Sequence, residues 1–187
     1  MFELTGKVAL ITGATGGIGM SIAKKMKLSG AKLILSGTKQ NVLSDLASEL
    51  GDDIKTIVTD LNSKDAILNL AQQAEDSFGQ IDILINNAGI TADNLFLRMK
   101  DEEWDKVINI NLSAPMRLTR QIIKGMLKRR SGRVIFITIF FFWSSESLSV
   151  IGVEINPGAI RLQVMPRLAT SKAIDLVKPA KADFEAA

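Results

Sequence analysis

The chain has 187 residues, of which 47% are hydrophobic and 23% are charged, and its formal net charge is +3. This composition is typical of a globular domain with a substantial core and not of a disordered chain. The sequence contains no cysteine, no histidine and no tyrosine. These absences exclude disulfides, thiolate or imidazole metal sites and a Ser-His-Asp triad, and the small net charge gives no indication of nucleic-acid binding.

The apolar runs of the sequence are too short to act as targeting or membrane segments. The run from Val8 to Ile11 leads into glycines and not into a signal-peptide cleavage site. The run from Val134 to Trp143 is much shorter than the roughly 20 residues that a membrane-spanning helix needs. We therefore expect a soluble, cytoplasmic protein without a membrane partner.

Short apolar runs alternate with helical patterns up to residue 138, which predicts a regular series of strands and helices. Ser63 is predicted to cap a helix, and Gly30, Gly51 and Gly79 are predicted to end helices. The predicted strands are Val8 to Thr12, Lys32 to Ser36, Ile54 to Val58, Ile81 to Ile85 and Val134 to Ile137. The predicted helices begin near Ile18, Val42, Ser63, Trp104 and Ser113.

Continuous apolar strands that alternate with helices predict an α/β fold, with a doubly wound parallel sheet of the Rossmann type between two helical layers. We expect residues 1–187 to form a single domain. Residues 1–138 would be its cofactor-binding core, and residues 139–187 would hold a degenerate catalytic segment and a final helix.

A glycine-rich turn joins the first predicted strand to the first predicted helix. It reads Thr-Gly-Ala-Thr-Gly-Gly-Ile-Gly over residues 12–19. Glycines permit a tight turn and let the backbone approach a pyrophosphate, whose charge the helix amino terminus favours. The strand before the turn and the helix after it are the context in which this pattern indicates a dinucleotide site. The alternative is a structural turn that happens to be rich in glycine.

The end of the second predicted strand indicates which dinucleotide is bound. Proteins that bind NAD tend to place an Asp or Glu there, which holds the ribose 2′-hydroxyl. This chain has Ser36, Gly37, Thr38 and Lys39 instead. Without a carboxylate to repel a 2′-phosphate, and with a lysine to attract it, the sequence favours NADP over NAD. The alternative is that Lys39 is a solvated loop residue.

Further motifs follow the third and fourth predicted strands and the helix after them. These motifs are Asp60-Leu61, Asn87-Ala88-Gly89 and Asn111-Leu112. With the glycine pattern, they resemble the short-chain dehydrogenase/reductase family. Within that family, the chain is most similar over residues 1–138 to bacterial reductases of type II fatty acid synthesis that act on 3-oxoacyl thioesters of acyl carrier protein.

The resemblance implies hydride transfer from NADPH to the 3-oxo group, in an enzyme of lipid metabolism that forms a homotetramer. It implies that Thr38 and Lys39 face the 2′-phosphate, that Asp60 and Leu61 meet the adenine, and that Asn111 is catalytic. It further implies contacts with the pyrophosphate from Gly13, Thr15, Gly17, Ile18 and Gly19, and with the nicotinamide half from Asn87, Ala88 and Gly89.

The sequence departs from the family at the proton donor. The family uses a Tyr-x-x-x-Lys pattern, in which the lysine lowers the pKa of the phenol, and a serine that orients the carbonyl. This chain has no tyrosine, and Ile139 stands where the serine is expected. A shifted alignment makes Ser149 and Lys172 the candidate catalytic residues and puts Leu168 at the tyrosine position.

Another alignment of this region remains open, in which residues 156–160 correspond to a later Pro-Gly loop of the family. For the chain as a whole, two alternatives to an active reductase remain open. It is either a nucleotide-binding or oligomerising protein without activity, or a truncated product.

A basic stretch runs from Lys106 to Ser145 without an acidic residue. One interpretation is a solvated helix whose cations suit the carboxyl end of the helix dipole. The other is a docking surface for an acidic partner. By resemblance, that partner would be acyl carrier protein, met at Arg129 and Arg130.

Overall fold

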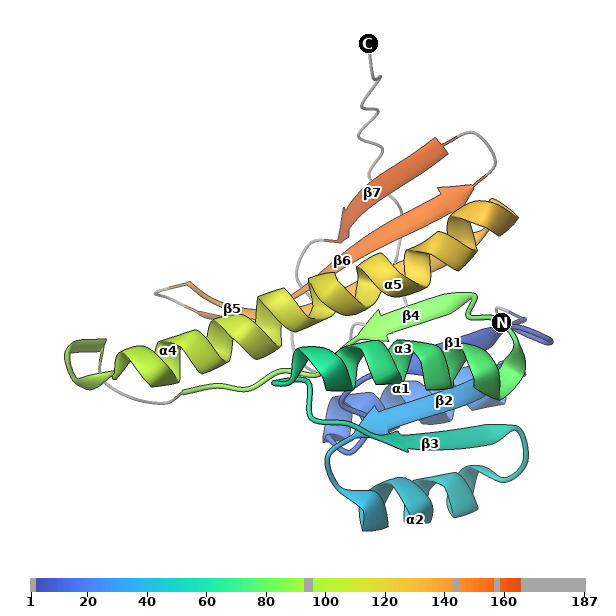
Figure 1. Cartoon of the computed structure of the whole chain (residues 1–187), viewed down its shortest axis with the longest axis horizontal. Helices are drawn as coiled ribbons and strands as arrows, with labels where there is room; N and C mark the ends of the chain where they lie inside the picture. Colours follow the sequence, from blue (N-terminus) through green and yellow to red (C-terminus); the bar gives the residue numbers. More distant parts are fainter. Residues whose placement is uncertain (1–2, 93–95, 143–144, 157–158, 166–187) are drawn as a thin grey trace.

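The computed structural model describes residues 3–92, 96–142, 145–156 and 159–165 of the chain. Within these ranges the strands form a seven-stranded sheet in the order β3-β2-β1-β4-β5-β6-β7, and helices flank it (Figure 1). The strands are β1 (Val8–Ile11), β2 (Lys32–Gly37), β3 (Ile54–Val58), β4 (Ile83–Asn86), β5 (Gly132–Phe142), β6 (Ser145–Asn156) and β7 (Ala159–Met165). The helical elements are α1 (Gly17–Leu28), α2 (Gln40–Leu50), α3 (Lys64–Phe78), the 3₁₀ turn η1 (Phe96–Arg98), α4 (Asp101–Ile108), the π-helical segment η2 (Asn109–Ser113) and α5 (Ala114–Arg129).

The neighbouring strands β3, β2, β1, β4 and β5 pair in parallel, as the continuous apolar runs predicted. Leu10 at the centre of β1 lies opposite Ile34 of β2 on one side and opposite Leu84 of β4 on the other, and all three side chains are buried. Strands with helices on both faces become apolar throughout because neither face meets water. The expected α/β class with a Rossmann-type parallel sheet is confirmed.

Each face of the sheet has its own apolar core. Helices α1 and α2 cover one face, where Ala23, Leu43 and Leu46 pack against the buried residues of β1 and β2. Helices α3 and α5 cover the other face, where Leu70 and Leu118 are fully buried. Each fully buried leucine or isoleucine contributes about 1.5–3 kcal/mol, so the two cores hold the sheet between two helical layers.

The predicted helix ends are confirmed at the clearest signals. Ser63 caps α3, because its side-chain oxygen accepts a hydrogen bond of 3.3 Å from the backbone N–H of Ala66. Gly79 follows the helix in the left-handed conformation, with φ of 76°. The helix expected around Trp104 begins at Asp101 and runs through η2 into α5 without a break.

The structure corrects the prediction for the chain after Ile137. The fifth strand was expected to end there, but β5 continues to Phe142. Strands β6 and β7 then add to the sheet in antiparallel fashion, which the parallel pattern did not predict. The run from Val134 to Phe142 consists of β-branched and aromatic residues, which favour extended structure.

Two other expectations for this part of the chain are not settled. The final helix was expected in residues 174–187, which lie outside the described ranges. The division of a single domain into a core and a catalytic segment stays a prediction. None of the helices in the described ranges is both long and apolar enough to cross a bilayer.

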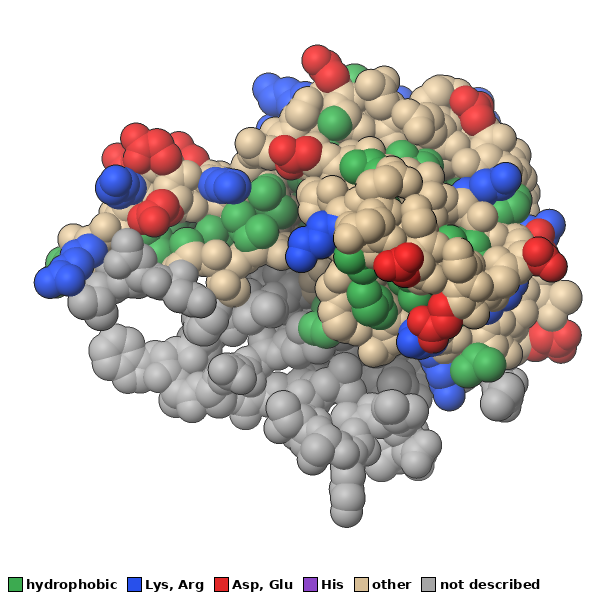
Figure 2. Space-filling view, turned by 90° about the horizontal axis from the view of Figure 1, so that it is seen from below, with side chains coloured by type: hydrophobic (Ala, Val, Ile, Leu, Met, Phe, Trp, Pro, Cys, Tyr) green, Lys and Arg blue, Asp and Glu red, His purple; other side chains and the backbone are tan. Residues whose placement is uncertain are grey.

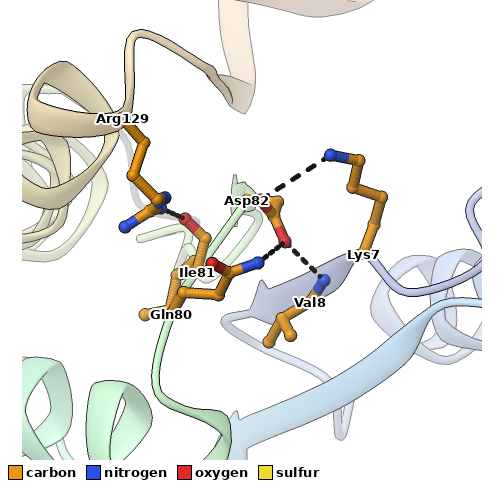
Figure 3. A network of polar contacts seen from close by, with 6 residues as sticks. All are labelled: Lys7, Val8, Gln80, Ile81, Asp82 and Arg129. Carbon is orange, nitrogen blue, oxygen red and sulfur yellow. Dashed lines mark hydrogen bonds and ion pairs between the residues drawn. The ribbon is translucent and has the colours of Figure 1, made fainter.

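A polar network closes the amino-terminal edge of the sheet (Figure 3). The buried carboxylate of Asp82 accepts hydrogen bonds from the Val8 backbone N–H at 3.0 Å and from the Gln80 side chain at 3.1 Å. The Lys7 ammonium lies 3.9 Å from its other oxygen. Arg129, at the end of α5, donates to the Ile81 carbonyl at 2.6 Å. Together these contacts tie β1, β4 and α5 at the edge opposite the glycine turn.

This network predicts a large cost for Asp82→Ala. The substitution leaves the buried Val8 N–H without its acceptor, so we expect unfolding to become easier by about 1.5–3 kcal/mol, as for hydrogen bonds to charged groups. Urea denaturation measures this change. Glu49→Ala is the control, because it removes only the exposed ion pair with Lys24 and should cost less than about 1 kcal/mol. Equal losses in the two variants would contradict this role for Asp82.

Candidate functional site

The glycine turn between β1 and α1 approaches the loop after β4 so closely that side chains are excluded. Gly13 has φ of 65°, and a Cβ atom there would lie 2.8 Å from the Ala88 Cα. A Cβ on Gly19 would collide with the carbonyl oxygen of Gly13. No side chain caps the amino end of α1 at Gly16, so its first N–H groups remain available to an anion.

Thr12 fixes the loop after β4 against this turn. Its buried hydroxyl oxygen accepts hydrogen bonds from the backbone N–H groups of Asn87 and Ala88, both at 3.1 Å, and the hydroxyl donates to the Ile85 carbonyl at 3.3 Å. The Asn87 amide donates in return to the carbonyls of Thr12 and Gly13, at 3.1 and 3.2 Å. These hydrogen bonds in both directions fix the position of the loop after β4 relative to the glycine turn.

A cavity of about 440 Å³ opens at the carboxyl edge of the parallel strands. Its size lies in the range typical of small-molecule sites, and its position is where open α/β sheets bind ligands. Most of the predicted cofactor-binding residues line it together with Asn111: Gly13, Thr15, Gly17, Ile18, Gly19, Thr38, Leu61, Asn87, Ala88 and Gly89. The structure brings these residues together, and their contact with a cofactor stays a prediction.

Two predicted cofactor residues do not line the cavity. The exposed Asp60 carboxylate accepts a hydrogen bond of 2.9 Å from the Asn62 backbone N–H, so it shapes the turn after β3. Lys39 is exposed and precedes α2 as its N-cap residue. No cofactor contact was predicted from the sequence for the other lining residues, which are Gly16, Ser36, Gly37, Thr59, Ile90, Thr91, Ile110 and Ile137. Of these, Gly16, Ser36 and Gly37 belong to motifs named from the sequence, and most of the others stand within a few residues of a predicted motif.

Asn111 lies in the π-helical segment between α4 and α5. Its amide group makes two hydrogen bonds with Ile90, donating to the carbonyl and accepting from the N–H, each at 2.8 Å. One π-helical turn inside a long helix often marks a functional site. Here it places Asn111 against the loop after β4, at the wall of the cavity. The predicted catalytic role of Asn111 is compatible with this position and is not tested by it.

The other predicted catalytic residues are placed only in part. Ser149 belongs to β6, where its backbone pairs with Thr138, one residue beyond Ile137 of the cavity wall. This register brings the Ser149 backbone near the site, and the described part of the structure does not extend to its side chain. Lys172 lies outside the described residues. Both assignments stay predictions.

Arg129 and Arg130 lie at the end of α5, just before β5 begins. They are therefore at the amino-terminal edge of the sheet, while the cavity lies at the carboxyl edge. The Arg129 guanidinium donates to the Ile81 carbonyl, whereas Arg130 is exposed and ends the helix with φ of 51°. Within one copy of the chain, neither arginine faces the cavity, and their contact with acyl carrier protein stays a prediction.

The residues around the cavity fit a dinucleotide. The glycine turn gives a backbone surface without side chains, the amino end of α1 favours negative charge, and the end of β2 carries no carboxylate. Among the described residues there is no group of three or more acidic side chains that could hold a metal ion.

Comparisons with known proteins agree with this architecture. The model of the short chain dehydrogenase family matches residues 7–140. Nodulation protein G of Rhizobium sp. (strain N33) is 48% identical over 158 residues, which are 84% of this chain and 60% of the relative. The 3-oxoacyl-[acyl-carrier-protein] reductase FabG of Haemophilus influenzae is 41% identical over 155 residues, or 83% of this chain and 60% of the relative.

A solved structure supports the same conclusion. A metagenomic short-chain oxidoreductase, crystallised in complex with NADP, superposes with a TM-score of 0.67 at 34% identity, over 70% of this chain and 61% of that one. This chain thus spans about 60% of the length of these relatives. The family match and the relatives show that the chain belongs to the short-chain dehydrogenase family.

Proposed function

We propose that the chain binds NADPH and serves the reduction of a 3-oxoacyl thioester of acyl carrier protein to the 3-hydroxyacyl thioester. The observation that carries the cofactor choice is the end of β2, where Gly37 and Thr38 line the cavity and no carboxylate is present. An acidic residue there would repel a 2′-phosphate, whereas Lys39, exposed next to this position, would attract it. The NADP in the related crystal structure supports this choice.

The residues of the chain have separate roles in this proposal. The N–H groups at the start of α1 would hold the pyrophosphate, Thr38 and Lys39 would meet the 2′-phosphate, and Asn87 would keep the nicotinamide half in place through its hold on the glycine turn. When bound, NADPH supplies the hydride for the 3-oxo carbon. The substrate class is supported by the name of the Haemophilus influenzae relative. A cytoplasmic location is part of the same proposal.

A second candidate function is nucleotide binding without turnover. The observation that favours it is the absence of tyrosine from the whole sequence, because the oxygen of the reduced substrate must receive a proton. Loss of a general acid typically costs a factor of about 10² to 10⁴ in rate. The intact cofactor cavity supports both candidates, so binding and turnover have to be measured separately.

Calorimetric titration of the purified chain with NADPH and NADH tests the cofactor choice. We expect saturable binding that is tighter for NADPH, because only NADPH carries the 2′-phosphate. Lys39→Glu should weaken NADPH binding by about tenfold or more and leave NADH binding nearly unchanged, since it replaces an attraction by a repulsion at one position. Equal affinity for the two cofactors, or binding of neither, would contradict the proposal.

The same preparation, given NADPH and an acetoacetyl thioester, separates the two candidates. Sustained oxidation of NADPH that follows the chain through purification supports the reductase. Tight binding without oxidation supports the nucleotide-binding protein.

We also propose that a second copy of this chain covers the exposed side of α4, η2 and α5. Leu112, Met116 and Leu127 on this continuous helix are 57%, 56% and 45% exposed. The first turn of α4 is acidic, whereas the last turn of α5 is basic. Figure 2 shows acidic side chains beside hydrophobic ones on the arm where Figure 1 places α4. An antiparallel second copy would bring opposite charges together around the apolar residues.

Sedimentation velocity of Met116→Glu tests this surface. A charge in the middle of the apolar row should shift the chain from a dimer or larger assembly to a monomer. Leu28→Glu is the matched control, because Leu28 is also exposed, at 76%, but lies at the end of α1. A monomeric unmodified chain, or equal effects of the two substitutions, would contradict the proposed surface.

A further inference from the structure

Gly37 ends β2 at a point where no side chain fits. It is buried and lines the cavity. A Cβ atom built on it would lie 2.8 Å from the Thr15 Cγ2 and 3.0 Å from the Thr15 Oγ1. Thr15 belongs to the glycine turn and lines the same cavity. The Thr15 side chain therefore occupies the space that any side chain at position 37 would need.

Rotation of Thr15 does not relieve this conflict. Its Cβ carries a methyl group, a hydroxyl and one hydrogen, and the staggered rotamers exchange these three substituents among three positions. Two of the three positions face Gly37, and only one can hold the hydrogen. Every rotamer of Thr15 thus leaves at least one heavy atom against position 37.

The backbone around Gly37 is fixed from two sides. Its carbonyl accepts a hydrogen bond of 2.9 Å from the Thr59 N–H, and the carbonyl of Ser36 accepts one of 2.9 Å from the Ala14 N–H. A shift of Gly37 away from Thr15 would break these contacts with β3 and with the glycine turn. A smaller side chain at position 15 removes the conflict without such a shift.

This packing bears on the choice of cofactor. An Asp or Glu at the end of the second strand, about 20 residues after the glycine pattern, holds the ribose 2′-hydroxyl in proteins that bind NAD. We propose that Thr15 constrains cofactor specificity, because its side chain opposes a carboxylate at position 37, beside the place proposed for the 2′-phosphate. This inference rests on the proposed NADPH preference.

A double-mutant cycle between positions 15 and 37 tests the coupling. The variants are Thr15→Ser, Thr15→Val and Gly37→Asp, together with Gly37→Asp in the serine and the valine background. Serine has a single heavy atom on its Cβ and can turn it away from position 37. Valine has the shape of threonine, so it keeps the conflict, and it serves as the matched control. Calorimetry gives the Kd for NADPH and NADH, and thermal unfolding without cofactor reports the packing.

We expect Gly37→Asp to shift the ratio of the NADPH and NADH dissociation constants toward NADH by about tenfold or more beyond its effect with threonine when position 15 is serine. Such a coupling lies within the range found for residues in contact. Gly37→Asp alone and Thr15→Val/Gly37→Asp should unfold at lower temperature than the serine double variant and should bind NADH more weakly. Failure of these two variants to fold, while the serine double variant folds, would equally support the steric conflict.

The opposite results separate this inference from the proposed function. The unmodified chain can prefer NADPH while Gly37→Asp changes the ratio of NADPH to NADH affinity by the same factor whether position 15 is threonine, serine or valine. That result overturns the role of Thr15 and leaves the NADPH proposal standing. If the unmodified chain prefers NADH, the proposed function is overturned and this inference with it.

Discussion

The functional half of this structure depends on the contact between the glycine turn after β1 and the loop after β4. Gly13 stands so close to Ala88 that there is no room for a Cβ atom. The buried Thr12 hydroxyl keeps the two segments at this distance, because it accepts hydrogen bonds from two backbone N–H groups of the loop. Leaving a buried polar group without its partner is costly, so the contact fixes both the cavity wall formed by these segments and the start of α1.

The carboxyl edge of the parallel strands forms the candidate site, whereas the amino edge is held by structural contacts. At the carboxyl edge, backbone groups and glycines surround a cavity whose lining suits an anionic ligand. At the amino edge, Asp82 and Arg129 bind backbone groups of β1 and the segment before β4. Arg129 therefore has a structural role that its place in a basic stretch did not indicate. The long helix connects the edges, since α5 ends at Arg129 and η2 places Asn111 at the cavity.

Much of this arrangement could be predicted from the sequence, because its signals are local. The glycine pattern, the cap at Ser63 and the apolar strands each lie within a few residues, and most predicted cofactor residues do meet at one cavity. What was missed depends on contacts between distant segments. No periodic pattern in the sequence indicates that β5 pairs with β6 or that Arg129 donates a hydrogen bond to Ile81. Likewise, the steric conflict for a side chain at Gly37, the last residue of β2, depends on Thr15 in the glycine turn after β1.

We propose that the turn after β1, the end of β2 and the loop after β4 form one NADPH site. A crystal structure of the chain with NADPH bound tests this site most directly. The pyrophosphate is expected at the amino end of α1 and the 2′-phosphate beside Thr38 and Lys39. A cofactor bound elsewhere, or a 2′-phosphate turned away from the end of β2, would contradict it.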